Sequence, residues 1–193
     1  MIKLSFGNTK TGKGIAIFNL PAITTCIGCT GLCASKCYAR KAERMYPKVL
    51  PAREANKEQA DSDDFINNMI EAVTKASKKK GFTGLFRIHE SGDFYNQKYL
   101  EAWKEIASNF PQIKFLAFTK SHQLDFGKIP QNLNVVYSLF PDTSKVLENM
   151  PKAIAVKKVE KLEKNEYLCP GSCAECNLCW NLKENETVYF EFH

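Results

Sequence analysis

Eight cysteines in two compact groups of four constrain this 193-residue chain more than any other feature. The first quartet is Cys26-x2-Cys29-x3-Cys33-x3-Cys37, and the second quartet is Cys169-x3-Cys173-x2-Cys176-x2-Cys179. Random placement does not give two such sets, and four thiolates within reach of one centre are what a Cys₄ metal site requires. The sequence therefore predicts two metal-binding loops, at residues 26–37 and 169–179.

The rest of the sequence favours a reduced, cytoplasmic setting for these thiols. The N-terminus has no charged head followed by an apolar stretch, so no signal peptide is expected. The best apolar run, residues 14–20, is too short to span a bilayer and ends at Pro21, so no membrane partner is expected. In such a compartment dense cysteines indicate metal more often than disulfides, which remain an alternative.

The spacing within each quartet favours iron–sulfur clusters over zinc. Zinc ribbons usually hold two Cys-x2-Cys pairs far apart in sequence, whereas each quartet here is one run with a ligand every three or four residues. That pattern resembles the loops that wrap [4Fe–4S] cubanes, and Cys169-Pro170 echoes their Cys-Pro pairing. We expect two [4Fe–4S] clusters, with two Cys₄ zinc sites as the alternative.

Net charge gives weak support for a nucleic-acid partner. The chain has 27 basic and 21 acidic residues, a formal +6. Eight thiolates would change this to 6 − 8 = −2, and two dicationic centres would restore +2. The best basic and aromatic patch combines two tyrosines with four cations. Its members are Tyr38, Tyr46, Arg40, Lys41, Arg44 and Arg53.

Alternating strand and helix patterns predict a single α/β domain over residues 1–193. Strands are expected at 14–20, 84–89, 113–118, 135–139, 153–156 and 187–192, and helices at 38–45, 52–80 with a break near 61–64, and 96–109. Residues 1–12 are expected to be turn-rich. The chain is too short for eight βα units, so we expect an open or partial (βα) barrel with a mostly parallel sheet.

Polar residues follow three of these strands and form a candidate pocket. Functional groups collect where parallel strands end, so we expect these side chains to lie beside the first quartet. The candidates are His89, Ser91, Gly92, Asp93, Thr119, Lys120, Ser138 and, from the first loop, Tyr38. The alternatives are structural: Asp93 as the N-cap of the next helix, and His89 as a hydrogen-bonded core histidine. Catalytic residues are not assigned.

Several of these segments resemble the phage "gene product 88" family. The resemblance rests on Asn8-Thr-Lys-Thr-Gly12, Leu20-Pro-Ala22 with Cys26, Cys33 and Cys37-Tyr-Ala39, Arg87-Ile-His-Glu-Ser-Gly-Asp-Phe94 with Tyr99 and Ala102-Trp103, and Cys169-Pro170 with Cys173, Cys176 and Cys179-Trp180. It covers most of the chain. It implies a protein made in a bacterial host cell, distantly similar to radical S-adenosylmethionine (SAM) proteins, with a partial barrel and at least one [4Fe–4S] cluster.

The same resemblance leaves three functions open. Cys169-x3-Cys173-x2-Cys176 has radical-SAM spacing, but Cys29-x3-Cys33-x3-Cys37 has one residue too many in its second interval, which argues against SAM as a cofactor. A closed four-cysteine cluster favours a redox or electron-transfer role with a redox partner. A cluster held by Cys26, Cys33 and Cys37 alone would keep an open iron for SAM or another small molecule. The third hypothesis is a zinc-binding phage protein associated with nucleic acid.

Overall fold

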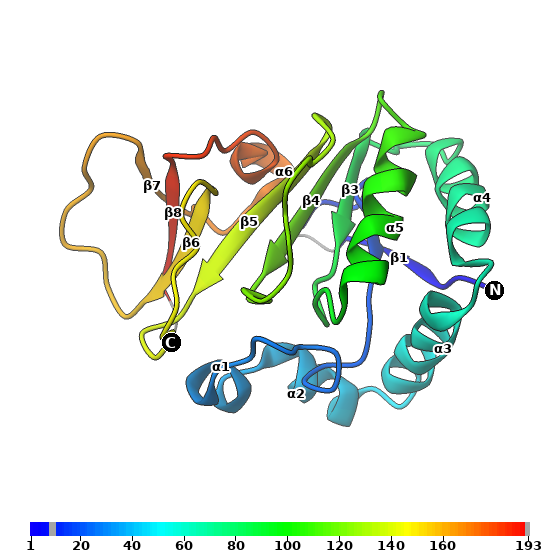
Figure 1. Ribbon diagram of the computed structural model, residues 1–193, viewed down its shortest axis with the longest axis horizontal. Coiled ribbons are helices and arrows are strands. Elements are labelled where there is room, and N and C mark those ends of the chain that lie inside the picture. Colours follow the sequence, from blue (N-terminus) through cyan, green and yellow to red (C-terminus); the bar gives the residue numbers. More distant parts are fainter. Residues whose placement is uncertain (8–10, 192–193) are drawn as a thin grey trace.

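The computed structural model describes residues 1–7 and 11–191, and its eight strands form one open sheet (Figure 1). Their order across the sheet is β1-β2-β3-β4-β5-β6-β8-β7. The strands are β1 (Leu4–Phe6), β2 (Ala16–Phe18), β3 (Leu85–Ile88), β4 (Lys114–Thr119), β5 (Leu133–Leu139), β6 (Lys152–Val156), β7 (Glu166–Leu168) and β8 (Thr187–Glu191). All neighbouring pairs are parallel except β1 with β2.

The helices lie along one edge and on both faces of this sheet. They are α1 (Gly31–Ser35), α2 (Tyr38–Met45), α3 (Val49–Asp61), α4 (Phe65–Ser77), α5 (Gln97–Ser108), α6 (Cys173–Cys176) and the 3₁₀ turn η1 (Leu178–Trp180). In Figure 1, α1 and α2 run below the edge that the parallel strands reach with their carboxyl ends. Helices α4 and α5 cover one face, so the opposite face is left for the segment that carries α6 and η1.

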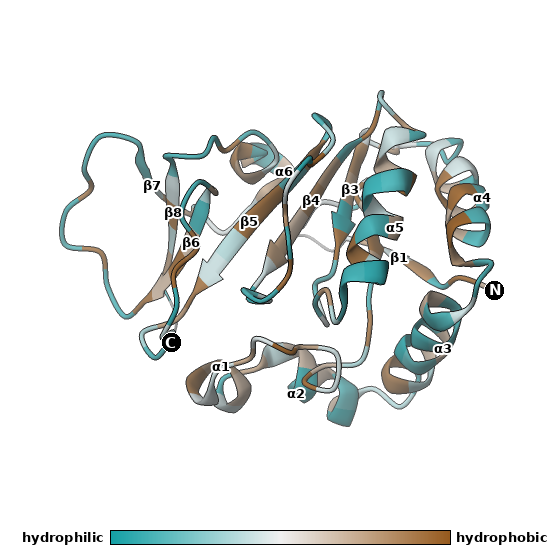
Figure 2. Cartoon of the chain, in the orientation of Figure 1, coloured by the Kyte–Doolittle hydropathy of each residue, from teal (hydrophilic) through white to brown (hydrophobic). Residues whose placement is uncertain are grey.

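Side chains that alternate along the strands give each face its own apolar cluster. On one face Phe18, Phe86 and Phe115 pack with Trp103 of α5, all fully buried. On the other face Leu116 and Val136 belong to a cluster that also contains Trp180 of η1. Figure 2 shows the corresponding colouring, with hydrophobic residues along the central strands and hydrophilic residues on the outer sides of α4 and α5.

Most sequence expectations for the elements are confirmed. The α/β class, the mostly parallel sheet and the break that separates α3 from α4 are all present. Two short strands were missed: β1 lies in a segment expected to be turn-rich, and β7 is only three residues long. The expected cysteine-rich loop also contains helix α1. The segment Asn8–Lys10 lies outside the described residues.

Helix lengths bear on membrane insertion. Within the described parts of the chain, no helix is long and apolar enough to cross a bilayer.

Candidate functional site

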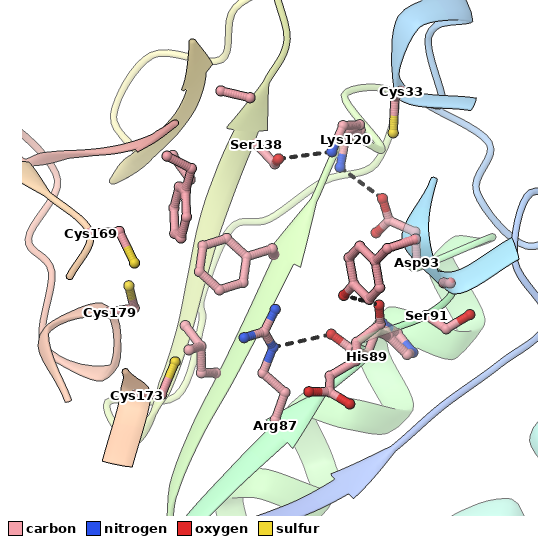
Figure 3. Close-up of a pocket in the computed structure, with 18 of the residues that line it drawn as sticks. Cys33, Arg87, His89, Ser91, Asp93, Lys120, Ser138, Cys169, Cys173 and Cys179 are labelled. Carbon is pink, nitrogen blue, oxygen red and sulfur yellow. Dashed lines mark hydrogen bonds between the residues drawn. The ribbon is translucent and has the colours of Figure 1, made fainter. Parts of the chain in front are cut away.

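One cavity of about 390 Å³ brings both cysteine quartets together. The thiol-bearing residues that line it are Cys26, Cys29, Cys33, Cys37, Cys169, Cys173, Cys176 and Cys179. In Figure 3, Cys169, Cys173 and Cys179 lie on one side of the cavity and Cys33 lies on the other. Two segments separated by 131 residues in sequence thus line the same cavity.

The first quartet is positioned at the carboxyl edge by a close backbone contact and two caps. A Cβ on Gly28 would lie 1.9 Å from the carbonyl oxygen of Lys120, so only glycine lets the loop approach β4 this closely. The side chain of Thr30 caps α1 by accepting from the N–H of Cys33 at 3.2 Å. Cys37 caps α2, since its Sγ accepts from the N–H of Arg40 at 3.5 Å.

The second quartet lies in the connection from β7 to β8. The N–H of Cys169 donates to the carbonyl of Tyr189 at 2.9 Å, which ties the start of the quartet to β8. The Sγ of Cys169 accepts from the N–H of Gly171 at 3.4 Å. At the far end, Asn134 of β5 donates to the carbonyl of Cys179 at 2.8 Å, and Trp180 is buried against the sheet.

Burial sets the protonation of several thiols. Desolvation raises the pKa of Cys26 to about 12, with the charge of Asp93 as the next cause. Desolvation also raises the pKa of Cys29 and of Cys179 to about 12. Cys26 interacts electrostatically with Cys33 and Cys37, so the thiols of the first quartet are near one another. Because metals bind thiolates, uptake must release protons from these thiols and is favoured as pH rises.

Each quartet faces a cation in the cavity. The Arg87 guanidinium lies 4.5 Å from the centre of the Phe118 ring, and its positive charge lowers the pKa of Cys173 and Cys179 against the larger effect of burial. Lys120 acts in the same sense on Cys29. Its Nζ donates to Ser138 Oγ at 2.8 Å, as Figure 3 shows. Negative charge at either quartet is therefore partly compensated from the sheet.

Asp93 lies in the cavity wall rather than at a helix end. Its carboxylate accepts from the N–H of Lys120 and from the N–H of Phe94, both at 2.7 Å. Helix α5 is capped instead by Asn96, which accepts from the N–H of Tyr99, so the N-cap alternative for Asp93 is wrong. Asp93 ties the loop after β3 to the end of β4, and burial raises its pKa.

His89 also lines the cavity, but its ring packs into the core. Nε2 is 2.8 Å from the Tyr99 hydroxyl, and the ring stacks on Tyr99 with a centroid separation of 5.7 Å. Burial lowers its pKa to about 3, so the ring is neutral at ordinary pH. The backbone carbonyl of His89 accepts from Arg87 Nε at 3.2 Å and thereby orients the guanidinium. These contacts fit the core-histidine alternative.

The other sequence candidates divide between the cavity and the core. Tyr38, Ser91, Gly92, Lys120 and Ser138 line the cavity. The Tyr38 hydroxyl donates to the carbonyl of Glu90 at 2.6 Å, which joins α2 to the loop after β3. Gly92 has φ +89° and a Cβ there would lie 2.6 Å from Leu20, so a tight turn is required. Thr119 is fully buried, accepts from the N–H of Ser121, and is not part of the lining.

Several lining residues were not selected from the sequence, among them Arg87, Phe118 and Phe140. A signal for Arg87 was present, because it shares a face of its strand with apolar Leu85 and so places a charge on a half-buried face of the sheet. Phe118 lies on β4 and Phe140 follows the end of β5, and nothing in the apolar spacing of these segments separates cavity residues from core residues. Whether such a side chain lines the cavity depends on the register in which β3, β4 and β5 pair.

The cysteines are free thiols in this structure. Over residues 1–7 and 11–191, no three or more His, Cys, Asp or Glu side chains form a ready-made metal-binding group. The donor chemistry nevertheless fits a thiolate-bound centre: each quartet supplies four sulfurs to one cavity, with a backbone N–H directed at Cys37 and another at Cys169. Hydrogen bonds to ligand sulfurs and nearby charge are the means by which proteins tune such centres.

Comparison with known proteins gives a consistent family match. The family model described as "Gene product 88" matches residues 2–174. The chain is 28% identical to the "Gene 88 protein" of Mycobacterium phage L5 over 191 residues, covering 83% of this chain and 80% of the relative. It is also 28% identical to the "Gene 88 protein" of Mycobacterium phage D29 over 189 residues, covering 81% and 78%. No solved structure matches.

The matched range treats the two quartets differently. All four cysteines of the first quartet fall inside residues 2–174, together with Cys169 and Cys173. Cys176 and Cys179 lie beyond the match.

Proposed function

The chain belongs to the gene product 88 family, and we propose that it is an iron–sulfur protein holding one [4Fe–4S] cluster in each quartet. The observation that carries this proposal is the cavity lined by all eight cysteines. A packed core has no need to direct eight thiols at one cavity, whereas two Cys₄ centres use all eight as ligands. Clusters bound there would supply one-electron redox chemistry, and we infer an electron-transfer role.

The residues around the thiols support this proposal. Cys26, Cys29, Cys33 and Cys37 would hold one cluster, and Cys169, Cys173, Cys176 and Cys179 the other. A cubane with four thiolates is negatively charged, and the cavity presents the cations Arg87 and Lys120 to the two quartets. The wall between them is aromatic, with Phe118 in edge contact with Phe190 at 5.9 Å. Such walls exclude water, and low solvent exposure affects cluster potential.

The architecture also supports a radical-SAM-like ancestry. The open, mostly parallel sheet places the first quartet directly after the first parallel strand, β2, at the carboxyl edge. We propose that this sheet is a partial barrel with the cavity on its inner side. The second quartet would then hold an auxiliary cluster that closes the same side from the β7–β8 connection.

A second candidate function depends on whether Cys29 is a ligand of the first cluster. If Cys26, Cys33 and Cys37 hold the first cluster alone, one iron remains open to SAM or another small ligand. The Cys29 thiol lies 3.5 Å from the carbonyl oxygen of Thr30, which offers it a backbone acceptor, and it also interacts with Cys33 and Cys26. The Cys29→Ala variant separates the two candidates. Unchanged iron content, with a SAM-induced change in the spectrum of the reduced cluster, would favour the open site.

The iron–sulfur proposal is tested by anaerobic purification followed by metal and sulfide analysis. We expect brown protein with about eight iron and about eight acid-labile sulfide per chain, as two cubanes contain. About two zinc ions and no sulfide would overturn the proposal in favour of two Cys₄ zinc sites. In that case nucleic-acid association becomes the leading function to test.

A further inference from the structure

We propose that residues 36–50 form a docking surface for an acidic protein that delivers single electrons to the first quartet. This inference rests on the proposed function and adds the class of partner and its point of contact. The surface consists of α2 with the residues on either side of it, and it lies at the edge of the sheet in Figure 1.

The charge of this surface is one-sided. Five cations are exposed: Lys36, Arg40, Lys41, Arg44 and Lys48. The single carboxylate of the segment, Glu43, is turned inward, where it accepts from Arg53 Nη1 and from the N–H of Ala22, both at 2.8 Å. Among the described residues, none of the five cations forms an ion pair. The segment therefore carries a net +4 that the chain itself does not neutralise.

Exposed apolar side chains lie among these cations. Met45 is 58% exposed, Tyr46 is 57% exposed, and Leu50 is also exposed. Tyrosine, methionine and arginine are the residues enriched where proteins contact one another. Arg53, which the sequence placed in this patch, is buried against Glu43 and donates to the carbonyl of Ala39 at 3.1 Å. Arg53 therefore holds Ala39 and Glu43 of α2 in place and is not part of the exposed surface.

The surface also covers the first quartet directly. Cys37 is the N-cap of α2, and the neighbouring Lys36 and Tyr38 line the cavity. A partner seated on α2 would thus be separated from the first quartet by a single helical layer. A second lysine-rich segment, residues 78–80, follows α4 and lies far from α2 in Figure 1.

These observations favour an acidic redox protein over nucleic acid. Nucleic acid would need cations but has no use for exposed Met45 and Leu50, and its binding would not require the quartet beneath. An acidic carrier uses all three features: the charge steers encounter, the apolar residues hold the contact, and the quartet receives the electron. One electron leaves the reduced carrier and enters the first cluster, so the carrier is oxidised by one electron and the cluster is reduced by one.

The experiment compares charge reversal on this surface with charge reversal elsewhere. The test variant is Lys41→Glu with Arg44→Glu, and the matched control is Lys78→Glu with Lys80→Glu; all four side chains are exposed. The cluster-loaded protein is mixed with a strongly acidic flavodoxin in its hydroquinone form. Stopped-flow absorbance gives the reduction rate and biolayer interferometry gives the affinity, at low and at high salt. Iron content and reduction by methyl viologen are measured first.

We expect the test variant to lose about tenfold or more in both rate and affinity at low salt, with the control unchanged. The rate for the unmodified protein should fall as salt rises. Equal losses in both variants, or a rate independent of salt, would overturn the docking proposal. So would selective loss of binding to a 20-nucleotide DNA strand with an unchanged flavodoxin rate. Absence of iron, or failure of viologen to reduce the protein, would instead overturn the proposed function.

Discussion

Each quartet supplies four sulfurs, but the two are held in place by different kinds of interaction. The first is held at an edge by polar contacts: Leu32 donates its N–H to Asp142 at 2.7 Å, and Tyr38 donates to the carbonyl of Glu90. The second is held on a face by apolar burial, with Trp180 and Leu182 inside the cluster formed around Leu116. The first quartet is therefore attached to the sheet edge from outside the core, while the second quartet is part of the core.

The largest expected difference concerns the stability of the fold. Trp180→Ala should lower the free energy of unfolding by about 3–5 kcal/mol, since a buried aromatic is replaced by a cavity. Tyr38→Phe removes only one hydrogen bond at the first quartet and should cost about 1 kcal/mol. Urea unfolding followed by circular dichroism measures both. Similar losses of unfolding free energy in the two variants would contradict the proposal that the second quartet belongs to the core and the first does not.

The next prediction tests whether the first quartet can be lost alone. Gly28→Ala places a Cβ 1.9 Å from a backbone oxygen of Lys120, so the loop must move away from β4. We expect about half of the iron to be lost, as one of two cubanes would be, with little change in thermal unfolding. Gly31→Ala is the matched control, because its nearest contact is 3.8 Å away at Asp142. Full iron in the Gly28→Ala protein would show that the close approach is dispensable.

Cysteine variants extend the same test to the ligands themselves. If the proposed cluster is bound there, Cys173→Ser should lose it and destabilise the fold, because Cys173 packs against the apolar cluster on the sheet and metal binding would be coupled to that packing. Cys33→Ser should lose one cluster with a smaller effect on unfolding. Iron analysis and the unfolding temperature are measured on both proteins prepared without oxygen. Equal destabilisation would mean that the first quartet is also part of the cooperative core.

The smallest expected effects come from the two cations. Arg87→Gln should lower the reduction potential of the second cluster, and Lys120→Gln that of the first, because a positive charge stabilises the reduced form. In an effective dielectric of about 20, a single charge that is not in direct contact contributes on the order of 2 kcal/mol or less. Redox titration followed by electron paramagnetic resonance resolves the two centres. If each substitution shifted both potentials equally, neither cation could be assigned to one quartet.

The sequence was most informative where local pattern decides structure. Alternation and helical spacing located β3, α5 and β4, and the caps and breaks around residues 61–64 separated α3 from α4. Strands β1 and β7 escaped because three residues give too little alternation, and pairing with β2 and β8 is what makes them strands. Asp93 had the local signature of a helix cap, but a longer-range bond to the N–H of Lys120 took precedence.

The candidate site was likewise predictable where local sequence decides it and not where long-range contacts do. Clustering of polar residues at the ends of β3, β4 and β5 predicted a pocket beside the first quartet, and Ser91, Lys120 and Ser138 line the same cavity as that quartet. That the second quartet shares their cavity could not be seen in the sequence. It depends on the β7–β8 connection crossing the sheet face, and on Asn134 and Trp180 holding it there.

The strand order has a consequence for biosynthesis. Strand β8 lies between β6 and β7, although both of those are translated before it. While the ribosome is making residues 169–186, the β6 edge that will pair with β8 has no neighbour, and β7 has nothing to pair with. Insertion of β8 must therefore follow the passage of the second quartet across the sheet. The position of the second quartet over the sheet is thus fixed only once β8 has inserted.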